Sequence, residues 1–427
     1  MLLVNDIRDH REKTVAGLRK RHLPDEQLAL VDRVLELDEQ RKNTQHSSDT
    51  LKAEMNKLSK AIGGLYKEGK RAEAEEMKQQ VTTQKVEVQT LQDQLHRIEG
   101  ELEQALLQLP NVPHERVPSG NTEEDNEVYQ KWDAPLPEMG EKALPHWELA
   151  KTYPLFDLEL GVKIAGSGFP VYRGKGARLQ RALVSFFLDE AADAGYEEVL
   201  PPHLVNEDTA RATGQLPDKE GQMYYVERDD LYLIPTAEVP VTNIYRDVIL
   251  SEDDFPIKMT AYTPCFRREA GSYGAHVRGL NRVHQFDKVE IVRIEHPDRS
   301  YDALEEMLDH VRMILKKLEL PYRILTLCGG DLGFTSALTY DFEVYSAAQK
   351  RWLEVSSVSN FETFQSNRLH LRYRAEKGRV LAHTLNGSAL ALARIVAAIV
   401  ENNQTEKGIV IPEVLRKYTG FDIIEPS

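Results

Sequence analysis

The chain has 427 residues, of which 41% are hydrophobic and 29% are charged, and its formal net charge is -15. This length predicts two or three domains and a large buried core. The negative charge excludes a generally basic nucleic-acid-binding surface, so any contact with RNA has to be a local patch. The two cysteines, Cys265 and Cys328, have no metal-like or disulfide-like spacing, which predicts packing roles and a reducing compartment.

The N-terminal stretch MLLVNDIRDHREK is charged within six residues and lacks the apolar core of a signal peptide. The longest apolar run, near Ala389–Val400, is interrupted by Arg394 and is too short to cross a bilayer. We therefore expect a cytoplasmic protein without a membrane contact.

The segment 25–109 predicts an antiparallel helical hairpin, preceded by a short helix that ends near residue 21. Its apolar residues recur at alternating steps of three and four, as in a heptad repeat. A break divides the repeat into two limbs of similar length, at Gly63, Gly64 and Gly69. Limbs of about 36 residues would project roughly 50 Å. A polar layer weakens the seam and can set its register, at Arg41, Thr44 and Ser48.

The tip of this hairpin is basic, whereas its two roots are acidic. Between Lys52 and Lys85, eight basic residues stand against five acidic ones, a net charge of +3. Six of these basic residues lie on the first limb and at the turn, at Lys52, Lys57, Lys60, Lys67, Lys70 and Arg71. Such a tip fits an arm that binds phosphates. A solvated coiled coil that contacts another protein would carry the same charges.

A segment rich in proline, glycine and acidic residues, 110–145, predicts a linker. We therefore expect one domain over 1–109 and a second over 146–427. In the second, the glycine-rich stretch 166–177 lacks the GK[ST] pattern and predicts a turn in a strand, not a nucleotide loop. A helix over Ala177–Ala194 and a short strand ending at Pro201 and Pro202 follow.

The stretch 263–290 predicts a strand, a glycine-containing loop and a returning strand. Cys265, Arg267 and Glu269 share one face of the first limb. One face of the second limb carries Arg282, His284, Phe286, Lys288 and Glu290. A lone phenylalanine among ionisable side chains is a poor core position and suits a flat aromatic ligand. A solvated strand face that contains one phenylalanine by chance has the same pattern.

Three further stretches carry candidate chemistry. In Pro235-Thr236-Ala237-Glu238, Thr236 is explained equally well as a helix cap. In WLEVSSVSN, 352–360, a carboxylate and hydroxyl groups form half of a magnesium site, although surface turns have the same composition. In 383–403 we expect a strand, an Asn386-Gly387 turn and an apolar helix from Ser388. The lone Arg394 in this helix needs an anion, which a neighbouring carboxylate would also supply.

FRREAG, the glycine loop and RVHQFDKVE resemble the second signature motif of the class II aminoacyl-tRNA synthetases, and the whole chain is most similar to the bacterial-type seryl-tRNA synthetases. The resemblance implies an α+β fold with an N-terminal antiparallel coiled-coil hairpin and a class II catalytic domain, whose mixed, mainly antiparallel sheet is flanked by helices. It also implies a homodimer, with the helix–strand–proline unit at the interface. The chain departs from the family at Ala275 and His276, where a basic residue and Asp are usual, so the resemblance implies no loop contact to the tRNA acceptor end at these two positions.

The resemblance implies ATP-dependent ligation of L-serine to tRNA(Ser) through seryl-adenylate, with Mg²⁺ on the ATP. Charging of tRNA(Sec) is left open. The hairpin would grip the long variable arm of the tRNA through the six basic residues named above. The chain has no zinc cluster, which excludes the zinc-dependent archaeal variety of the enzyme.

The family's site residues map onto this sequence position by position. Those expected to bind serine are Thr236, Ala237, Glu238, Arg267, Glu290 and Ser388. Those expected to bind ATP are Arg267, Arg268, Glu269, Val283, Phe286, Glu354, Val355, Ser356, Ser357 and Arg394. Arg267 and Arg394 are the expected catalytic residues, and Glu354 and Ser357 the expected magnesium ligands.

Two rival functions share parts of this pattern. A ligase that charges a carrier protein would keep the adenylate residues but have no use for a long basic-tipped hairpin. A catalytically silent coiled-coil scaffold would keep the hairpin but should have lost Arg267, Glu290 or Arg394. All of these features are present, which favours the synthetase.

Overall fold

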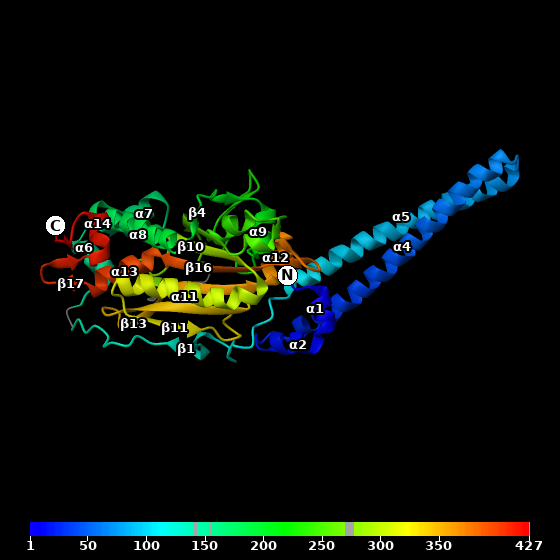
Figure 1. Cartoon of the computed structure of the whole chain (residues 1–427). Coiled ribbons are helices and arrows are strands. Elements are labelled where there is room, and N and C mark those ends of the chain that lie inside the picture. The colour runs from blue at the N-terminus through cyan, green and yellow to red at the C-terminus, as the bar shows by residue number, and fades with distance from the viewer. Residues whose placement is uncertain (141–142, 154, 270–276, 427) are drawn as a thin grey trace. The chain divides into compact units, whose positions relative to one another are not determined.

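The computed structural model describes residues 1–140, 143–153, 155–269 and 277–426, and the chain forms two compact units (Figure 1). The first unit contains residues 1–19 and 23–110, and the second contains residues 20–22 and those from 111 onward. No helix within these described ranges has a stretch that is both long and apolar enough to cross a bilayer.

The first unit is a helical hairpin with short helices at its N-terminal end. The short helices are α1 (Val4–Asp9), α2 (Arg11–Arg19) and α3 (Asp25–Leu28). The two limbs are α4 (Leu30–Lys67) and α5 (Arg71–Gln108), which lie side by side in Figure 1. With 38 residues each, the limbs are about 57 Å long at 1.5 Å per residue.

The two limbs run antiparallel, as the heptad pattern predicts. At the root, Arg33 of α4 bonds to Glu101 of α5 over 3.0 Å. At the tip, the Tyr66 hydroxyl donates to Glu75 over 2.7 Å. Every predicted seam position is buried or half-buried, while most residues between them are exposed. The expected polar layer is part of this seam, since Thr44 and Ser48 are buried.

The break between the limbs is shorter than we expected. Helix α4 continues through Gly63 and Gly64 to Lys67, and of the three glycines only Gly69 lies in the turn, with φ at +77°. Each helical glycine costs about 1 kcal/mol relative to alanine. Seam packing on both sides of the two glycines outweighs that cost, so the prediction of a break at Gly63 is wrong.

The second unit is built on an eight-stranded sheet in the order β1-β11-β12-β13-β16-β10-β9-β4. Its strands are β1 (Glu127–Gln130), β4 (Glu197–Glu198), β9 (Ile257–Phe266), β10 (Gln285–Glu295), β11 (Tyr322–Thr326), β12 (Leu338–Ser346), β13 (Arg351–Glu362) and β16 (His383–Ala391). All neighbouring pairs are antiparallel except β4 and β9, which are parallel. The expected mixed, mainly antiparallel sheet is confirmed.

Three long helices pack on this sheet and form the main core. They are α8 (Gly174–Asp193), α11 (Ser300–Lys317) and α13 (Leu392–Asn402), and Figure 1 shows α11 lying along the strands. Apolar side chains from all three helices join those of the strands in one buried cluster. Leu183, Phe187, Leu308, Ile395 and Val396 are among its fully buried members.

Shorter elements complete the second unit. The helices are α6 (His146–Thr152), α7 (Leu158–Ile164), α9 (Glu207–Thr213), α10 (Glu238–Asn243), α12 (Thr363–Leu369), α14 (Glu413–Thr419) and the 3-10 turns η1 (Glu123–Asp125), η2 (Glu252–Asp254) and η4 (Pro297–Arg299). The strands are β2 (Phe156–Asp157), β3 (Val171–Tyr172), β5 (Leu204–Val205), β6 (Tyr225–Val226), β7 (Leu231–Leu233), β8 (Ile249–Ser251), β14 (Arg372–Ala375), β15 (Gly378–Leu381), β17 (Gln404–Thr405), β18 (Gly408–Val410) and β19 (Ile423–Ile424), in four small sheets.

The segment 110–145, which its composition predicted to be a linker, packs almost entirely as part of the second unit. From residue 111 it belongs to the second unit, and β1 is an edge strand paired with β11. Trp132 lies edge-on against Tyr322, with 5.5 Å between the ring centroids. Backbone pairing and this aromatic contact hold a polar, proline-rich sequence in place, so composition alone did not reveal the structure.

The C-terminal motif also differs from its prediction. We expected a turn at Asn386-Gly387 and a helix from Ser388, but β16 runs unbroken through these residues to Ala391 and the helix begins at Leu392. The absence of a side chain at Gly387 has another reason. A Cβ atom there would lie 3.1 Å from Val358 of the neighbouring strand, so the glycine permits close packing between β13 and β16.

The packing of α8 yields a test of this fold. Alanine usually favours a helix over glycine, but a Cβ atom at Gly176 would lie 1.9 Å from the backbone oxygen of Leu155. We expect Gly176→Ala to destabilise the second unit by about 1–3 kcal/mol, as overpacking does. Thermal unfolding followed by circular dichroism measures this.

Gly100→Ala in α5 is the matched control, because a Cβ atom there meets nothing within 4 Å. This variant should stabilise the hairpin by about 0.5–1 kcal/mol. Equal effects of the two substitutions would contradict the packing described for α8.

Candidate functional site

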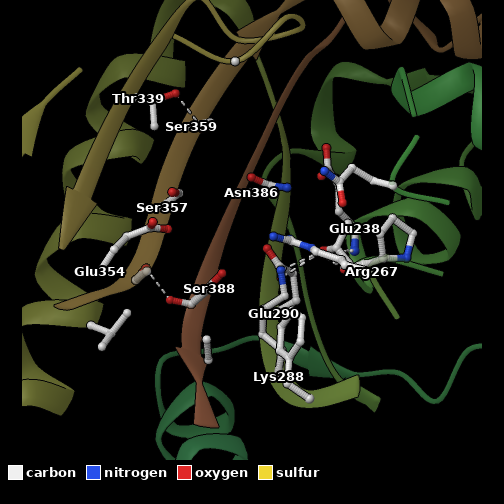
Figure 2. Close-up of a pocket in the computed structure, with 18 of the residues that line it drawn as sticks. Glu238, Arg267, Lys288, Glu290, Thr339, Glu354, Ser357, Ser359, Asn386 and Ser388 are labelled. Carbon is white, nitrogen blue, oxygen red and sulfur yellow. Dashed lines mark hydrogen bonds and ion pairs between the residues drawn. The ribbon is translucent and has the colours of Figure 1, made fainter. Parts of the chain in front are cut away.

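One cavity of about 530 Å³ opens on the second unit, and most of the predicted site residues line it. They come from β10, β13 and β16, from α13, from the start of α10 and the chain just ahead of it, and from the segments next to β9 and β10. Figure 2 shows Glu354 and Ser357 on one side of the cavity and Glu238, Arg267 and Glu290 on the other. The predicted residues that line it are Thr236, Glu238, Arg267, Glu269, Val283, Phe286, Glu290, Glu354, Val355, Ser356, Ser357, Ser388 and Arg394.

Strand β10 provides one wall of the cavity. Phe286, Lys288 and Glu290 alternate along it and all line the cavity, as the period of two predicts. The pairing of β10 with β16 is irregular between Lys288 and Glu290, where Lys288 faces Ala391 but Glu290 faces Ser388. This irregularity sets the Ser388 position directly across from Glu290, although the two residues are far apart in the sequence.

A buried ion pair lies at the closed end of this wall. The Lys288 ammonium bonds to the Glu290 carboxylate, and both side chains are less than a tenth exposed. Lys288 also donates to the Thr236 hydroxyl over 2.9 Å, and that hydroxyl donates to Glu290 over 3.2 Å. Because buried charges are costly without partners, this triangle holds the three groups in fixed positions.

A second buried carboxylate, Glu238, lies beside this triangle. It accepts a hydrogen bond of 2.6 Å from Gln365 of α12. Burial, and then the nearby Glu290 charge, raise the pKa of Glu238 to about 7. A cation placed between the two carboxylates would favour the ionised form of Glu238, so this end of the cavity is suited to an ammonium group.

Arg267 and Glu269 follow directly after β9. The Arg267 guanidinium lies over the Phe286 ring, 5.3 Å from its centroid, an arrangement that favours contact between a cation and an aromatic face. Glu269 pairs with Arg282 over 2.8 Å. An aromatic ligand that stacks on the same face of Phe286 requires Arg267 to move off it, toward the middle of the cavity.

Arg394 of α13 projects from the other side. Its Nε donates to the Asn281 carbonyl over 2.8 Å, its Nη1 donates to the Glu354 carbonyl over 2.5 Å, and Nη1 lies 3.5 Å from the Glu354 carboxylate. Desolvation opposes ionisation of Glu354, but the charges of Arg394, Arg267 and Arg282 lower the pKa of its carboxyl. Arg394 therefore has the neighbouring carboxylate that its sequence context required.

A bulge in β13 brings Glu354 and Ser357 to the same wall. Phe342 pairs with Ser356, but the next residue of β12, Glu343, pairs with Glu354, which leaves Val355 as an extra residue. In a regular strand, residues three apart point to opposite faces. The extra residue reverses this alternation, and Figure 2 shows both side chains pointing the same way.

These two residues fit the expected magnesium half-site. The Ser357 hydroxyl donates to Asp341 over 2.6 Å, so its oxygen lone pairs remain available to a cation. Burial, and then the Glu354 charge, raise the pKa of Asp341 well above its usual value. A divalent ion near Glu354 would oppose both effects, which is the behaviour of a carboxylate in a second coordination layer.

Three predicted residues lie away from the cavity. Arg268 is exposed and lies over Tyr224, at 5.8 Å from its ring centroid. The side chain of Ala237 is buried in a separate apolar cluster. The His284 ring stacks on Phe169, so it does not continue the row of Phe286 and Glu290. Strand β10 begins only at Gln285, which explains why the alternation fails before it. Ala275 and His276 lie outside the described residues.

Sequence reasoning missed several residues of the site. Lys288 was noticed only as a member of an ionisable row, although it binds both Thr236 and Glu290. Asp341 alternates with buried residues in β12, as Thr339 and Glu343 do, so no signal set it apart from an ordinary polar strand face. Gln365 had no local signal, because only the packing of α12 brings it to Glu238.

Comparison with known proteins supplies a family for this arrangement. Residues 1–113 match the seryl-tRNA synthetase N-terminal domain, and residues 224–403 match the tRNA synthetase class II core domain (G, H, P, S and T). The chain is 51% identical to the serine–tRNA ligase of Salinibacter ruber, over 99% of this chain and 98% of that protein. It is 47% identical to the serine–tRNA ligase of Chlorobaculum parvum over the full length of both.

Solved structures agree with the sequence relatives. Seryl-tRNA synthetase from Pyrococcus horikoshii, complexed with ATP, superposes with a TM-score of 0.92 at 32% identity over the whole of both chains. The cytoplasmic serine–tRNA ligase of Naegleria fowleri in complex with AMP has a TM-score of 0.88 at 27% identity, over 100% of this chain and 99% of that one.

The raised pKa of Glu238 makes a prediction about stability. Because the pKa is about 7 in the folded protein and about 4.3 in an unfolded chain, the folded state holds the proton more tightly, and stability is lost as pH rises between these values. The parent chain should therefore lose stability as pH rises, whereas Glu238→Gln, which has no carboxyl at this position, should not. We expect the free energy of unfolding of Glu238→Gln, minus that of the parent chain, to increase by about 3 kcal/mol from pH 4 to pH 8. Urea denaturation at each pH measures this.

The exposed Glu376 provides the control, since Glu376→Gln removes the same charge from the surface of the same unit. The difference in unfolding free energy between Glu376→Gln and the parent chain should stay constant from pH 4 to pH 8. A flat difference for Glu238→Gln as well would contradict the burial and charge described for this end of the cavity.

Proposed function

The chain belongs to the seryl-tRNA synthetase family of class II aminoacyl-tRNA synthetases, and we propose that its cavity activates L-serine with ATP and passes it to tRNA(Ser). One observation carries the assignment of the site. Phe286 and Glu290 lie on the same wall of one cavity, roughly 13 Å apart along β10, with Arg267 and Arg394 also lining it. A purine, a phosphate chain and an ammonium group in a row match this order.

Serine binds at the closed end in this proposal. Its ammonium group lies between Glu290 and Glu238, two buried carboxylates that face one Lys288 cation. The bound ammonium supplies the positive charge that the pair lacks. Thr236, held by Lys288, contacts the amino acid, and Ser388, across from Glu290, contacts the serine hydroxyl. The buried side chain of Ala237 leaves only its backbone available to serine.

ATP binds along the rest of the cavity. The adenine ring stacks on Phe286, its amino group donates to Glu269, and the main chain at Val283 bonds to the base. The segment from Glu354 to Ser357 lies beside the phosphates. Arg268 lies over Tyr224 outside the cavity, so its expected contact with ATP would require the side chain to turn inward.

The first step is attack of the serine carboxylate oxygen on the α-phosphorus, with pyrophosphate leaving. The carboxylate is already ionised, so no general base is needed. Arg267 contacts both the carboxylate and the α-phosphate and thereby offsets the repulsion between two anions. Arg394 binds the terminal phosphate. Catalysis consists of positioning and of neutralising the charge that grows in the transition state.

Glu354 and Ser357 would hold Mg²⁺ against the ATP phosphates. When bound, the ion neutralises phosphate charge and orients the leaving pyrophosphate. The protein's own part is to offer one carboxylate oxygen and one hydroxyl oxygen, with Asp341 holding the hydroxyl proton. The phosphates and water supply the remaining ligands.

In the second step, a hydroxyl of the terminal tRNA ribose attacks the carbonyl carbon of seryl-adenylate, and AMP leaves. The hairpin binds the variable arm through its tip. Lys57, Lys60, Lys67, Lys70 and Arg71 are exposed there, and Lys52 is half-exposed. Charging of tRNA(Sec) stays a prediction, which the same assay with that tRNA tests.

We also propose a homodimer in the cytoplasm. Apolar side chains lie exposed at Ile164 and Leu200, which are 68% and 81% exposed, and at Leu204. Leu200 and Leu204 belong to the stretch that follows α8, the part that the family uses for dimerisation. A partner subunit would cover apolar surface that a single chain leaves in water.

The activation step tests this function directly. We expect the purified chain with ATP and Mg²⁺ to exchange labelled pyrophosphate into ATP when serine is present. Arg394→Ala should reduce this exchange about 10²–10³-fold, because it removes a preorganised positive charge from the phosphates. Arg374→Ala on the exposed part of β14 is the matched control and should behave as the parent chain does.

Exchange that proceeds with threonine or alanine but not with serine would overturn the substrate assignment. Full exchange by Arg394→Ala, with a circular dichroism spectrum like that of the parent chain, would remove Arg394 from the mechanism without affecting the substrate.

The hairpin assignment has its own test. We expect the triple variant Lys57→Glu, Lys60→Glu and Lys67→Glu to raise KM for tRNA(Ser) at least about tenfold, because each phosphate contact contributes to affinity. Pyrophosphate exchange should stay at the parent level, since the activation site is in the second unit. Aminoacylation measured at several salt concentrations should also show a weaker dependence on salt.

A second triple variant changes the net charge by the same amount elsewhere: Lys131→Glu, Lys377→Glu and Lys407→Glu, all exposed on the second unit. It should keep KM for tRNA near the parent value. If both triples raise KM equally, net charge and not the hairpin tip determines the affinity.

A further inference from the structure

A buried histidine–glutamate pair lies outside the cavity, in contact with one of its walls. His146 begins α6 and Glu401 lies near the end of α13, and both side chains are fully buried. The His146 Nδ1 lies 2.6 Å from the Glu401 carboxylate. Neither residue lines the cavity, and the proposed reaction gives neither a role.

Glu401 is held as a carboxylate by several donors. The His146 backbone N–H donates to it over 2.8 Å, Gln349 donates over 2.9 Å, and the Ser346 hydroxyl donates as well. Burial opposes ionisation, but the His146 ring, the His146 backbone N–H and the Ser346 hydroxyl lower the pKa of Glu401. A carboxylate with this many donors fixes the orientation of the His146 ring.

The other ring nitrogen of His146 accepts a backbone hydrogen bond. The Leu280 N–H donates to Nε2 over 2.8 Å. Nε2 must therefore be unprotonated, so Nδ1 carries the proton and donates it to Glu401. The pair thus connects α13 to the backbone of the segment that leads into β10.

The glycine before Leu280 shows how closely the ring approaches this backbone. Gly279 has φ at +70°, and a Cβ atom there would lie 2.2 Å from Nε2 of His146. Only glycine accommodates both the conformation and the contact. The segment at 279–280 is therefore held directly against the His146 ring.

The next residues form the nucleotide end of the cavity. Leu280, Asn281, Arg282 and Val283 all line it. The Asn281 carbonyl accepts from Arg394 over 2.8 Å, and the Asn281 amide donates to Gln349 over 3.1 Å. Gln349 also donates to Glu401, so a continuous set of hydrogen bonds joins the buried pair to Arg394.

We propose that His146 and Glu401 are a positioning pair for ATP: they hold residues 279–283 so that Asn281, Arg282 and Val283, and through Asn281 also Arg394, are in place for the nucleotide. This inference rests on the proposed function, which assigns Val283 and Arg394 to ATP. The serine-binding residues Thr236, Glu238 and Glu290 share no hydrogen bond with the pair in the described part of the chain. The pair therefore acts on ATP and not on serine.

Two conservative variants separate this role from simple stabilisation. His146→Asn places an amide near the Nδ1 position and keeps the donor to Glu401, but it leaves the Leu280 N–H without an acceptor. His146→Gln places its amide oxygen near the Nε2 position and keeps that acceptor. We expect His146→Asn to raise KM for ATP about tenfold in pyrophosphate exchange. His146→Gln should stay within about twofold of the parent, and KM for serine should be unchanged in both.

A readout that does not depend on activity is amide hydrogen exchange of a peptide covering residues 277–284. His146→Asn should speed exchange at Leu280, and His146→Gln should restore the protection. His310→Asn controls for the loss of a buried imidazole as such. His310 belongs to α11, packs against Tyr196 and does not line the cavity. It should lower the melting temperature and leave both KM values unchanged.

The possible results are distinct. If KM for ATP is unchanged in His146→Asn, or rises equally in both His146 variants and in His310→Asn, the pair is structural only and the inference fails. If the parent chain shows no serine-dependent exchange, the proposed function fails. Amide exchange then decides the positioning of residues 279–283: equal protection at Leu280 in both His146 variants would overturn it.

Discussion

The buried ion pair between Lys288 and Glu290 is the interaction on which the site depends. Removing two charges from water costs several kcal/mol per ion, and only good geometry compensates for it. The Thr236 hydroxyl completes that geometry, since it accepts from Lys288 and donates to Glu290. Apart from its proposed role in binding serine, the pair fixes the position of β10 relative to the segment before α10.

The neighbouring Glu238 is in a different electrostatic state from Glu290. One cation serves two buried carboxylates, and Glu238 receives an amide donor instead of a second cation. Burial, and then the nearby Glu290 charge, raise its pKa. In the proposed function, a substrate ammonium would correct this imbalance, whereas a neutral ligand of the same size would not. Selectivity for a free amino group would then follow from the balance of charges, before any contact with the substrate side chain.

Irregular strand pairing is the structural means by which distant residues reach the cavity together. In β13 the extra residue Val355 turns Glu354 and Ser357 to one side. In β16 the irregular register sets Ser388 across from Glu290. Bulges frequently occur next to active sites because they re-aim side chains that a regular strand would separate. Both lie in the central strands of the sheet, where the surrounding pairs hold them firmly.

These irregularities also explain how far the sequence could lead. The heptad spacing predicted the hairpin, and the period of two predicted that Phe286, Lys288 and Glu290 share a wall, because each pattern reflects one regular element. The prediction of a turn at Asn386-Gly387 was wrong, because the glycine permits close packing with Val358 and the strand continues through it. Gln365 and the His146–Glu401 pair had no local pattern, because only tertiary packing brings their partners together.

The net negative charge of the chain does not prevent it from binding anions, because electrostatic interactions in salt solution act over short distances. A protein of -15 has to attract two polyanions, ATP and tRNA. At physiological ionic strength, charges on the surface are screened beyond about 8 Å, so a ligand responds to the residues close to it. Within that distance the phosphates would meet Arg267 and Arg394 in the cavity, and the tRNA would meet the lysines of the hairpin tip. The acidic remainder of the surface then disfavours RNA that approaches elsewhere, so an excess of acidic residues makes the two basic places more selective.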